Sequence, residues 1–286
     1  MPLCSIRRRS KKKLTKIDQA RAFLSSQHSS VGEICLHPDS LQFYQARKVI
    51  GDAFGGKTTD KGSDVINSIL SQTMPEILGE DTASTSSRQA LNAFGLGFFA
   101  DEQLRKGGMI VGIRDSSGGV QAVIVFREYN VMTERKSNKV VDFFHGVRAY
   151  ISMSKDPLGV PPVLADKSKM KQWEKATKKM ESMDDMFRKW HRQYGPTEPH
   201  FYVGVVASDP DGQGKGYCKE VMTMLGAAAD ACHVACYLET QEKNRPYYEK
   251  FGYEAVSKVD LVFGEGEEEI RLPGSVMVRH VSSKDT

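Results

Sequence analysis

Residues 203–217 read VGVVASDPDGQGKGY, and this stretch decides the fold. An apolar run stops at an Asp-Pro turn, and three glycines then follow within five residues. The run HFYVGVVA (200–207) is nearly continuous, which is typical of a strand buried on both faces. The residues after position 213 have the spacing of an amphipathic helix. The sequence therefore predicts a strand, a glycine loop and a helix in direct succession.

A junction of this kind is suited to binding an anion. Backbone N–H groups and the positive end of the helix dipole converge on one point, and glycine lets a ligand approach the backbone closely. Two common phosphate loops do not fit. The triphosphate loop needs Ser or Thr after its lysine, but Gly216 follows Lys215, and the dinucleotide spacing GxGxxG is also missing. From the loop alone, a cofactor site and a tight turn remain equal alternatives.

The flanking sequence predicts the elements around this junction. The run MIVGIRDSSGGVQAVIVFREY (109–129) predicts an antiparallel hairpin, because two β-rich segments flank a short glycine turn. Helical spacing predicts helices at residues 41–54, 63–78, 88–106 and 167–194. We interpret residues 129–165 as irregular and as the start of an insertion that ends near 195. The polar run DTASTSS (81–87) is expected to be a loop.

Composition excludes several classes of protein. The chain has 286 residues and a formal charge of +4, yet residues 1–16 hold seven Lys/Arg and no acid, so the remainder sums to −3. The folded part therefore gives no support for nucleic-acid binding, and no apolar run is long enough to cross a membrane. Five irregularly spaced cysteines suggest neither a disulfide framework nor a zinc site, which favours reduced thiols inside the cell.

The basic start has three readings. The run RRRSKKK is consistent with a nuclear address, an organelle transit peptide or a solvated tail. We expect a disordered basic tail over residues 1–30 and a single domain over 31–286, with the insertion at about 129–195. The cytoplasm is the expected compartment, with nucleus and organelle as alternatives, and the oligomeric state is left open.

Two motifs carry a resemblance to a known family. The run Gln213-Gly214-Lys215-Gly216 resembles the acetyl-CoA pyrophosphate loop of the GNAT N-acetyltransferases, which reads Gln/Arg-x-x-Gly-x-Gly/Ala. The segment YLETQEKNRPYYEKFGY (237–253) resembles their second motif, and is especially similar to the puromycin N-acetyltransferase branch. The specific resemblance covers roughly residues 198–280. Cys218 and Ser208 depart from the small residues that the family usually has at these places.

The resemblance implies an α/β (α+β) fold, in which a central mixed, mostly antiparallel twisted sheet of about seven strands is flanked by helices. It implies acetyl-CoA as the donor and no metal. The loop amides would hold the diphosphate, and the strand before the loop would pair with the pantetheine arm. The cofactor-binding residues expected on this basis are Val206, Ala207, Ser208, Gln213, Gly214, Lys215, Gly216, Tyr217, Cys218 and Asn244.

Three residues are candidates for proton transfer. Tyr248 matches the family's general acid towards the leaving thiolate, and a phenol keeps its proton at neutral pH; the alternative is that its ring only packs and its hydroxyl bonds to backbone. Glu239 is the best candidate base, with a salt bridge to Arg245 as its alternative role. His200 is a weaker candidate base, because a histidine at a strand edge is more often a surface or capping residue, and Asn244 could be a simple helix cap.

The sequence therefore predicts an acetyl-CoA-dependent N-acetyltransferase that acts on the primary amine of a small molecule or a peptide. One alternative is a catalytically silent CoA-binding module of the same fold. Another is a nuclear protein-lysine acetyltransferase, suggested by the basic start. No nucleic acid or membrane is expected as a partner.

Overall fold

The computed structural model of the chain describes residues 14–27, 31–35, 43–55, 65–78, 81–130, 139–263 and 269–282. Its centre is a seven-stranded sheet of order β1-β2-β3-β4-β5-β7-β6. Neighbouring strands are antiparallel except β4 and β5, which run parallel. The mixed, mostly antiparallel sheet confirms the predicted fold class. The strands are β1 (Val31–Cys35), β2 (Met109–Arg114), β3 (Val120–Tyr129), β4 (His200–Ser208), β5 (Cys236–Gln241), β6 (Glu254–Phe263) and β7 (Ile270–Arg279).

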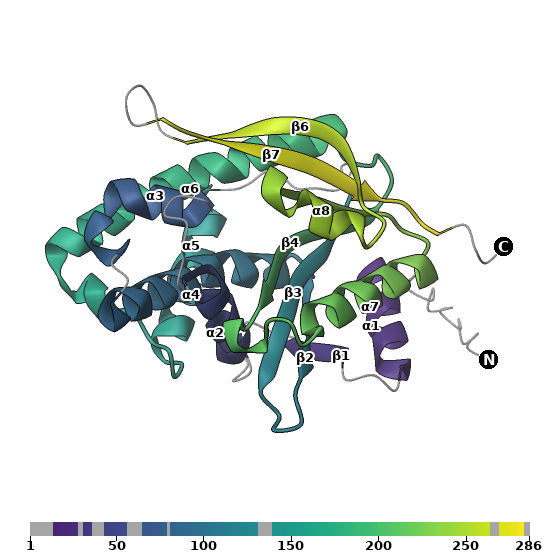
Figure 1. Cartoon of the computed structure of the whole chain (residues 1–286), viewed down its shortest axis with the longest axis horizontal. Coiled ribbons are helices and arrows are strands. Elements are labelled where there is room, and N and C mark those ends of the chain that lie inside the picture. Colours follow the sequence, from purple (N-terminus) through teal and green to yellow (C-terminus); the bar gives the residue numbers. More distant parts are fainter. Residues whose placement is uncertain are drawn as a thin grey trace, which may run out of the picture.

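Helices cover both faces of the sheet (Figure 1). One face carries α2 (Phe43–Gly55), α3 (Val65–Thr73), α4 (Thr82–Arg105), α5 (Lys139–Ser154) and α6 (Lys167–Tyr194); the other carries α1 (Lys16–Ser26), α7 (Tyr217–Ala231) and α8 (Arg245–Glu249). Short 3-10 turns connect them: η1 (Pro75–Leu78), η2 (Pro162–Ala165), η3 (Pro210–Gly212) and η4 (Glu242–Asn244). None of the helices described has the length and apolar character of a membrane span.

The central strands divide the core into two layers. Successive residues of a strand point to opposite faces, and β3 follows this alternation. Val123 and Val125 pack with α2 and α4, whereas Ala122, Ile124 and Phe126 pack with α1 and α7. Both sets are buried. A strand covered on both sides explains why the run at 120–129 is apolar almost throughout.

The sheet opens between β4 and β5. Their parallel pairing consists of two residue pairs, Phe201 with Cys236 and Tyr202 with Tyr237. Beyond these pairs, β4 continues to Ser208 along β3 alone, while β5 continues along β7. The register between β3 and β4 also shifts at Gly204, which marks a bulge. The strands therefore diverge towards the end of β4 that leads into the glycine loop.

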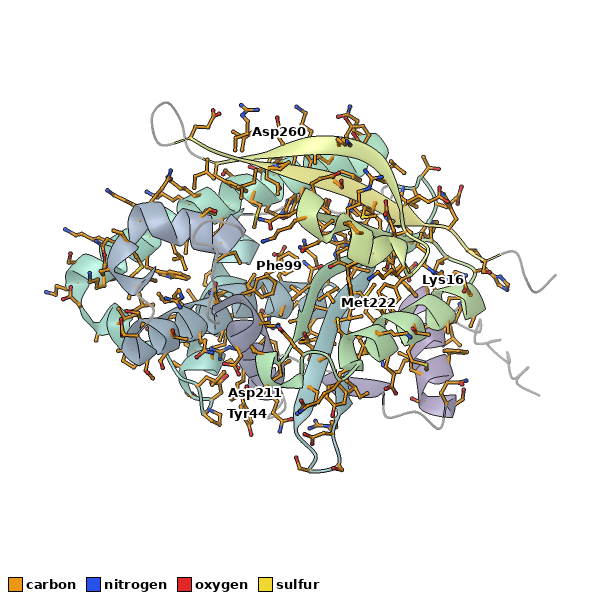
Figure 2. The ribbon with its side chains drawn as sticks, in the orientation of Figure 1. Lys16, Tyr44, Phe99, Asp211, Met222 and Asp260 are labelled. Carbon is orange, nitrogen blue, oxygen red and sulfur yellow. The ribbon has the colours of Figure 1, made fainter. Side chains whose placement is uncertain are left out.

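The start of the chain corrects the tail prediction. Residues 16–26 form helix α1, capped by Thr15 and Asp18 in a reciprocal capping box. Its buried face, which includes Ile17 and Leu24, packs on α7 and β3. The Lys16 ammonium donates to the Cys232 carbonyl at the end of α7 over 2.6 Å (Figure 2). The predicted tail was read from charge alone, whereas the apolar spacing after residue 16 makes a helix; residues 1–13 lie outside the described part.

Two predicted irregular segments are helical instead. Within the expected irregular stretch 129–165, residues 139–154 form α5. The polar run after residue 81 opens α4, because the Asp81 side chain accepts from the Ser84 backbone N–H and caps the helix. The long charged helix at 167–194 is confirmed as α6. Helix α6 packs against α3 and also against β6. It therefore runs along one side of the molecule (Figure 1).

Candidate active site

The glycine loop lies between the end of β4 and the start of α7, as the sequence predicts. Gly214 and Gly216 have φ angles of 79° and 86°, a backbone conformation that side chains other than glycine rarely adopt. A Cβ atom added at either position would meet no atom within 4 Å. These glycines are therefore not required by packing. The loop backbone has a conformation that only glycine adopts without strain, and the space next to it is open.

Backbone N–H groups converge on this open space. Gly216 is the N-cap of α7, and the first helical hydrogen bond beyond it runs from the Glu220 N–H to the Gly216 carbonyl. The amides of Tyr217, Cys218 and Lys219 lie in the first helical turn, where no helical carbonyl precedes them. Free amides, an N-terminal dipole and unfilled space together fit the diphosphate of a nucleotide-type ligand.

The neighbouring positions differ in how they take part in the loop. The Gln213 and Lys215 N–H groups turn inward, to the Pro210 and Gly212 carbonyls at 3.2 and 3.3 Å, so these two amides stabilise the turn itself. The Lys215 side chain is exposed; hydrogen bonds from Ser117 and Gly119 lower the pKa of Asp115 on the adjacent hairpin, and the Lys215 charge adds a smaller contribution in the same direction. Lys215 thus adds positive charge beside the loop.

The end of β4 lines the opening in the sheet. Val206, Ala207 and Ser208 pair with β3 on one side, while the side facing β5 is unpaired beyond Tyr202. Their main-chain groups on that side are available to an extended ligand, in the manner of an added strand. The structure brings these three residues together with the loop.

Tyr248 faces the same opening from α8. Its hydroxyl lies near the Thr240 side chain at the end of β5 and near the Cys218 thiol of α7. Burial raises its pKa, and the nearby thiol raises it further, while the hydrogen bond to Thr240 opposes the shift. The raised pKa means that the Tyr248 hydroxyl keeps its proton at neutral pH. Such a group can donate a proton to a developing anion.

Tyr247 is the adjacent phenol, which the sequence makes a much weaker candidate than Tyr248 for the general acid. Its hydroxyl is buried beside the Cys218 thiol, yet it has no hydrogen bond of good geometry. Cys218 thus contacts an aromatic pair and does not obstruct the glycines.

Asn244 lies at the turn between η4 and α8, and its side chain is exposed. It occupies the N-cap position but forms no capping hydrogen bond. The capping alternative is therefore wrong, and its amide is available to a ligand.

Glu239 lies in β5, beyond the last residue pair with β4. Its Oε1 atom has no accessible surface and no hydrogen bond of good geometry. Burial raises the pKa of the carboxyl to about 8, the Tyr237 and Tyr202 hydroxyls oppose this shift, and the charge of Asp184 adds to it. The salt bridge to Arg245 is not formed, because Arg245 pairs with Glu249 at 2.7 Å and Glu242 at 3.3 Å. A carboxyl with this pKa is suited to accept a proton near neutral pH.

His200 does not fit the role of base. Its side chain is fully buried at the start of β4, and both ring nitrogens are engaged, Nε2 with His191 at 2.6 Å and Nδ1 with the Glu198 carbonyl at 2.7 Å. Burial also lowers its pKa. The surface reading is wrong as well. The apolar residues that follow it indicated that this strand enters the core, which places its first residue inside.

A large groove leads to the opening from the side of α4, α5 and α6. Its volume is about 2250 Å³, well above the range of roughly 300–1000 Å³ for ordinary small-molecule pockets. The floor is apolar and reaches Gly204 and Val205 of β4. The Phe99 ring lies against Gly204, where a Cβ would come within 2.5 Å of it. Gly204 thus lets the groove reach the strand backbone.

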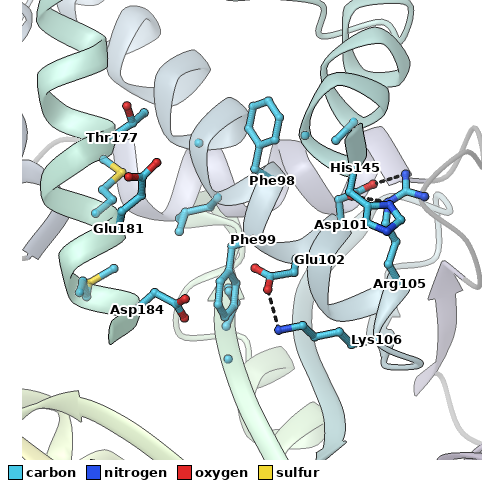
Figure 3. A pocket seen from close by; sticks show the side chains of 18 of the residues that line it. Phe98, Phe99, Asp101, Glu102, Arg105, Lys106, His145, Thr177, Glu181 and Asp184 are labelled. Atoms are coloured by element: carbon cyan, nitrogen blue, oxygen red, sulfur yellow. Dashed lines mark hydrogen bonds and ion pairs between the residues drawn. The ribbon is translucent and has the colours of Figure 1, made fainter. Parts of the chain in front are cut away.

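Carboxylates line this groove. Figure 3 shows Glu181 and Asp184 of α6 extending towards Phe99 and Glu102 of α4. Asp184 pairs with Arg188, and Glu102 pairs with Lys106 at 2.6 Å. Glu181 forms no ion pair with any residue that the structure describes. The sequence analysis missed these residues, because helical charge on α4 and α6 looks like an ordinary solvated face.

The arrangement has the parts needed for acyl transfer to an amine: an anion site, an unpaired strand edge, a phenol, a carboxyl with a raised pKa and a groove with acidic walls. In the described ranges, no three His, Cys, Asp or Glu side chains are grouped as metal ligands.

Comparison with known proteins finds a family model that matches this region. Residues 185–253, 69 of the 286, match the sequence model of the acetyltransferase (GNAT) family. The match begins within α6 and runs through β4, the glycine loop, α7, β5 and α8. It therefore covers every residue proposed above for the donor and for proton transfer.

Several solved acetyltransferase structures are similar to this chain at low sequence identity. Histone acetyltransferase HPA2 and related acetyltransferase from Corynebacterium glutamicum is 16% identical, with 90% of this chain and 98% of that chain covered and a TM-score of 0.42. Arylalkylamine N-acetyltransferase 2 from Aedes aegypti is 11% identical, with 88% and 98% covered and a TM-score of 0.47. Polyamine N-acetyltransferase from Drosophila melanogaster is 10% identical, with 85% and 97% covered and a TM-score of 0.41. These values carry no information on the substrate, and the puromycin-like branch stays a prediction.

Proposed function

We propose that this enzyme transfers an acetyl group from acetyl-CoA directly to a primary amine, and the match of residues 185–253 to the GNAT acetyltransferase family model supports this. The observation that carries the proposal is the strand-to-helix junction, where Gly214 and Gly216 leave free space in front of first-turn amides. These amides would take the diphosphate of the donor, and the unpaired edge of β4 would pair with its pantetheine arm.

The donor supplies an acetyl group activated as a thioester. The amine nitrogen attacks the acetyl carbon, a C–N bond forms, and the C–S bond breaks. The β4 backbone at Val206 or Ala207 would donate an N–H to the carbonyl oxygen as it gains negative charge. Glu239 takes the proton that the amine loses, and Tyr248 gives a proton to the departing thiolate. The products are an amide and free CoA thiol.

The acceptor is proposed to enter along the groove between α4, α5 and α6. Its acidic walls, including Glu181 and Asp184, favour an acceptor that carries positive charge besides the reacting amine. The aromatic floor at Phe98 and Phe99 suits the aliphatic part of such a molecule. The volume admits either a polyamine or a basic peptide.

The test is to incubate the protein with acetyl-CoA and a panel of amines, polyamines and lysine peptides, and to follow thiol release. Gly216→Ala should weaken CoA binding roughly tenfold, about 1.4 kcal/mol, in calorimetry. Gly118→Ala is the matched control, since Gly118 has a φ of 85° and equally open space but lies in the β2–β3 turn. Equal CoA affinity in the two variants would contradict the proposed diphosphate site.

Tyr248→Phe separates an enzyme from a silent CoA-binding module. Loss of the phenolic proton should lower kcat by about 10²-fold or more and leave CoA affinity unchanged. Tyr247→Phe is the control for the aromatic pair and should retain most of the turnover. If purified protein binds CoA without any thiol release on the whole panel, the silent module is the correct reading.

A further inference from the structure

The end of helix α6 is held in an aromatic stack that crosses three strands. The buried His191 ring stacks on Tyr129 of β3, with 3.8 Å between ring centroids and 21° between planes. On its other side it stacks on Tyr237 of β5, at 4.0 Å and 11°. Because β3 and β5 are the two neighbours of β4, this single ring bridges the strands on either side of it.

A hydrogen bond joins the same ring to β4 itself. The Nε2 atoms of His191 and His200 are 2.6 Å apart, and Nδ1 of His200 is 2.7 Å from the Glu198 carbonyl oxygen. A carbonyl only accepts, so Nδ1 of His200 carries the hydrogen and its Nε2 accepts in the neutral ring. Nε2 of His191 must then donate. Burial lowers the pKa of both rings, that of His191 to about 2, and the Arg127 charge adds to this, so the pair stays neutral.

This joint lies at the base of the sheet opening. Tyr202 and Tyr237 form the last residue pair before β4 and β5 diverge. Glu239 follows two residues after Tyr237, so both side chains leave the same face of β5. Whatever fixes Tyr237 therefore also fixes the strand from which the Glu239 carboxyl extends.

We propose that His191 is a positioning residue that seats the end of α6 on the base of the β4–β5 opening and thereby holds the Glu239 carboxyl in its buried place near Asp184, a residue that lines the acceptor groove. The inference rests on the proposed function, in which Glu239 accepts the proton of the amine. The final turn of α6 would then have a positioning role that no sequence motif predicts.

The groups facing Glu239 show how the joint acts. They are Tyr202 from β4, Tyr237 from β5 and Asp184 from α6, and the Arg127 guanidinium of β3 lies over the Tyr202 ring at 5.7 Å. Asp184 precedes His191 by seven residues, which is about two helical turns, so both side chains lie on the same face of α6. Displacing the His191 ring therefore moves two of these neighbours, Tyr237 and Asp184, and admits water to the carboxyl.

The experiment compares kcat/KM against pH in the wild type, His191→Gln and His191→Phe. Glutamine keeps an N–H donor but loses the ring, so the rising limb of the profile should move to lower pH by about one unit or more as Glu239 becomes solvated. Phenylalanine keeps the stack and should leave the limb close to that of the wild type. CoA affinity should be unchanged in both, because the glycine loop lies at the other end of β4. An unmoved limb in His191→Gln would overturn the inference.

Two further variants keep the test decisive. Trp190→Phe is the matched control, since Trp190 packs on Phe187 of the same helix; an equal shift there would mean that any loosening of α6 suffices, and the inference fails. If His191→Gln does not fold, Gly195→Ala replaces it, because a Cβ there would lie 2.5 Å from the His191 carbonyl oxygen and 2.6 Å from its ring, and would displace both. Gly195→Ala should then move the limb in the same direction.

The inference and the proposed function fail in different ways. Absence of CoA binding and of thiol release in the wild type would refute the function. The pH dependence of unfolding reports the same carboxyl without turnover, so the joint is still tested in that case. If His191→Gln leaves both the rate profile and the pH dependence of unfolding as in the wild type, only the joint is refuted.

Discussion

At the residue scale, Glu239 combines a reactive role with a cost in stability. A carboxyl with a folded-state pKa of about 8 keeps its proton in the folded protein while the unfolded chain loses it above roughly pH 4.3. The folded state then binds more protons, and stability falls as pH rises between these two values, by up to about 1.4 kcal/mol per pH unit. The contribution of protonated Glu239 to the free energy of unfolding is fully present at acidic pH and is lost as the pH rises through 8.

Glu239→Gln should therefore gain stability relative to the wild type as pH rises from about 5 to 8, with a constant difference above that range. Denaturant unfolding at a series of pH values measures this. Glu242→Gln is the control of opposite sign, because a hydrogen bond from Ser275 lowers the pKa of Glu242. If the two variants show parallel pH curves, Glu239 is not the desolvated carboxyl described above.

The site residues differ in how far the sequence could predict them. The glycine loop and Tyr248 follow from local spacing, so they could be named before any fold was known. His191 and the groove carboxylates could not, because their environments are made by contacts across the fold. His191 meets Tyr129 and Tyr237 only once three strands and α6 have come together. In the sequence it is one histidine on a charged helix.

At the element scale, the insertion is tied to the rest of the fold by a buried ion pair. Arg47 of α2 is 1% exposed, bonds to the Ala93 carbonyl of α4 at 3.1 Å, and pairs with Asp156 in the turn after α5. Two groove-lining helices are thus fixed to one guanidinium. Burial lowers the pKa of Arg47 and the Asp156 charge opposes this, so removing the carboxylate leaves a buried charge without its counter-ion.

Asp156→Asn should therefore destabilise the protein by about 3–5 kcal/mol, measured by urea unfolding. The amide still accepts from the Leu158 and Gly159 backbone N–H groups through the position of Oδ1, so the loss reports the ion pair. Lys48→Ala is the neighbouring control: its pair with Asp52 spans one helical turn at the surface and should cost no more than about 0.5 kcal/mol. A similarly small loss of unfolding free energy in the two variants would mean that Arg47 finds another counter-ion when Asp156 is replaced.

Element prediction succeeded where one local signal dominates. The β2–β3 hairpin and α6 were expected at nearly the residues where they occur, because a glycine turn and an amphipathic repeat are complete within the segment. The start of α4 was missed because its first turn is made of Thr and Ser, and only the cap at Asp81 marks it. Helix α5 was missed because the Pro-Pro at 161–162 led us to interpret the whole of 129–165 as irregular, although these prolines lie after the helix has ended.

At the scale of the whole molecule, α1 covers the face of the sheet that also carries α7. Its buried residues Ile17, Ala20 and Leu24 join α7 and β3 in one apolar layer. The Lys16 N–H also donates to Glu128 Oε2 over 2.8 Å, and the Lys16 ammonium caps the end of α7. A cation at a helix C-terminus is favourable by roughly 0.3–1 kcal/mol. The first helix is thus part of the fold that positions α7 and its amides.

Deleting residues 1–27 should consequently lower stability by several kcal/mol, since burial of one Leu or Ile side chain is worth about 1.5–3 kcal/mol. Removing only residues 1–13 leaves the Thr15 cap and all the contacts of Lys16, and should leave the midpoint of thermal unfolding near that of the full chain. We expect the longer deletion to weaken CoA binding at raised temperature, because α7 carries the proposed diphosphate site and would lose its packing against α1. Equal melting midpoints for the two truncations would show that α1 is dispensable and that α7 is held by the sheet alone.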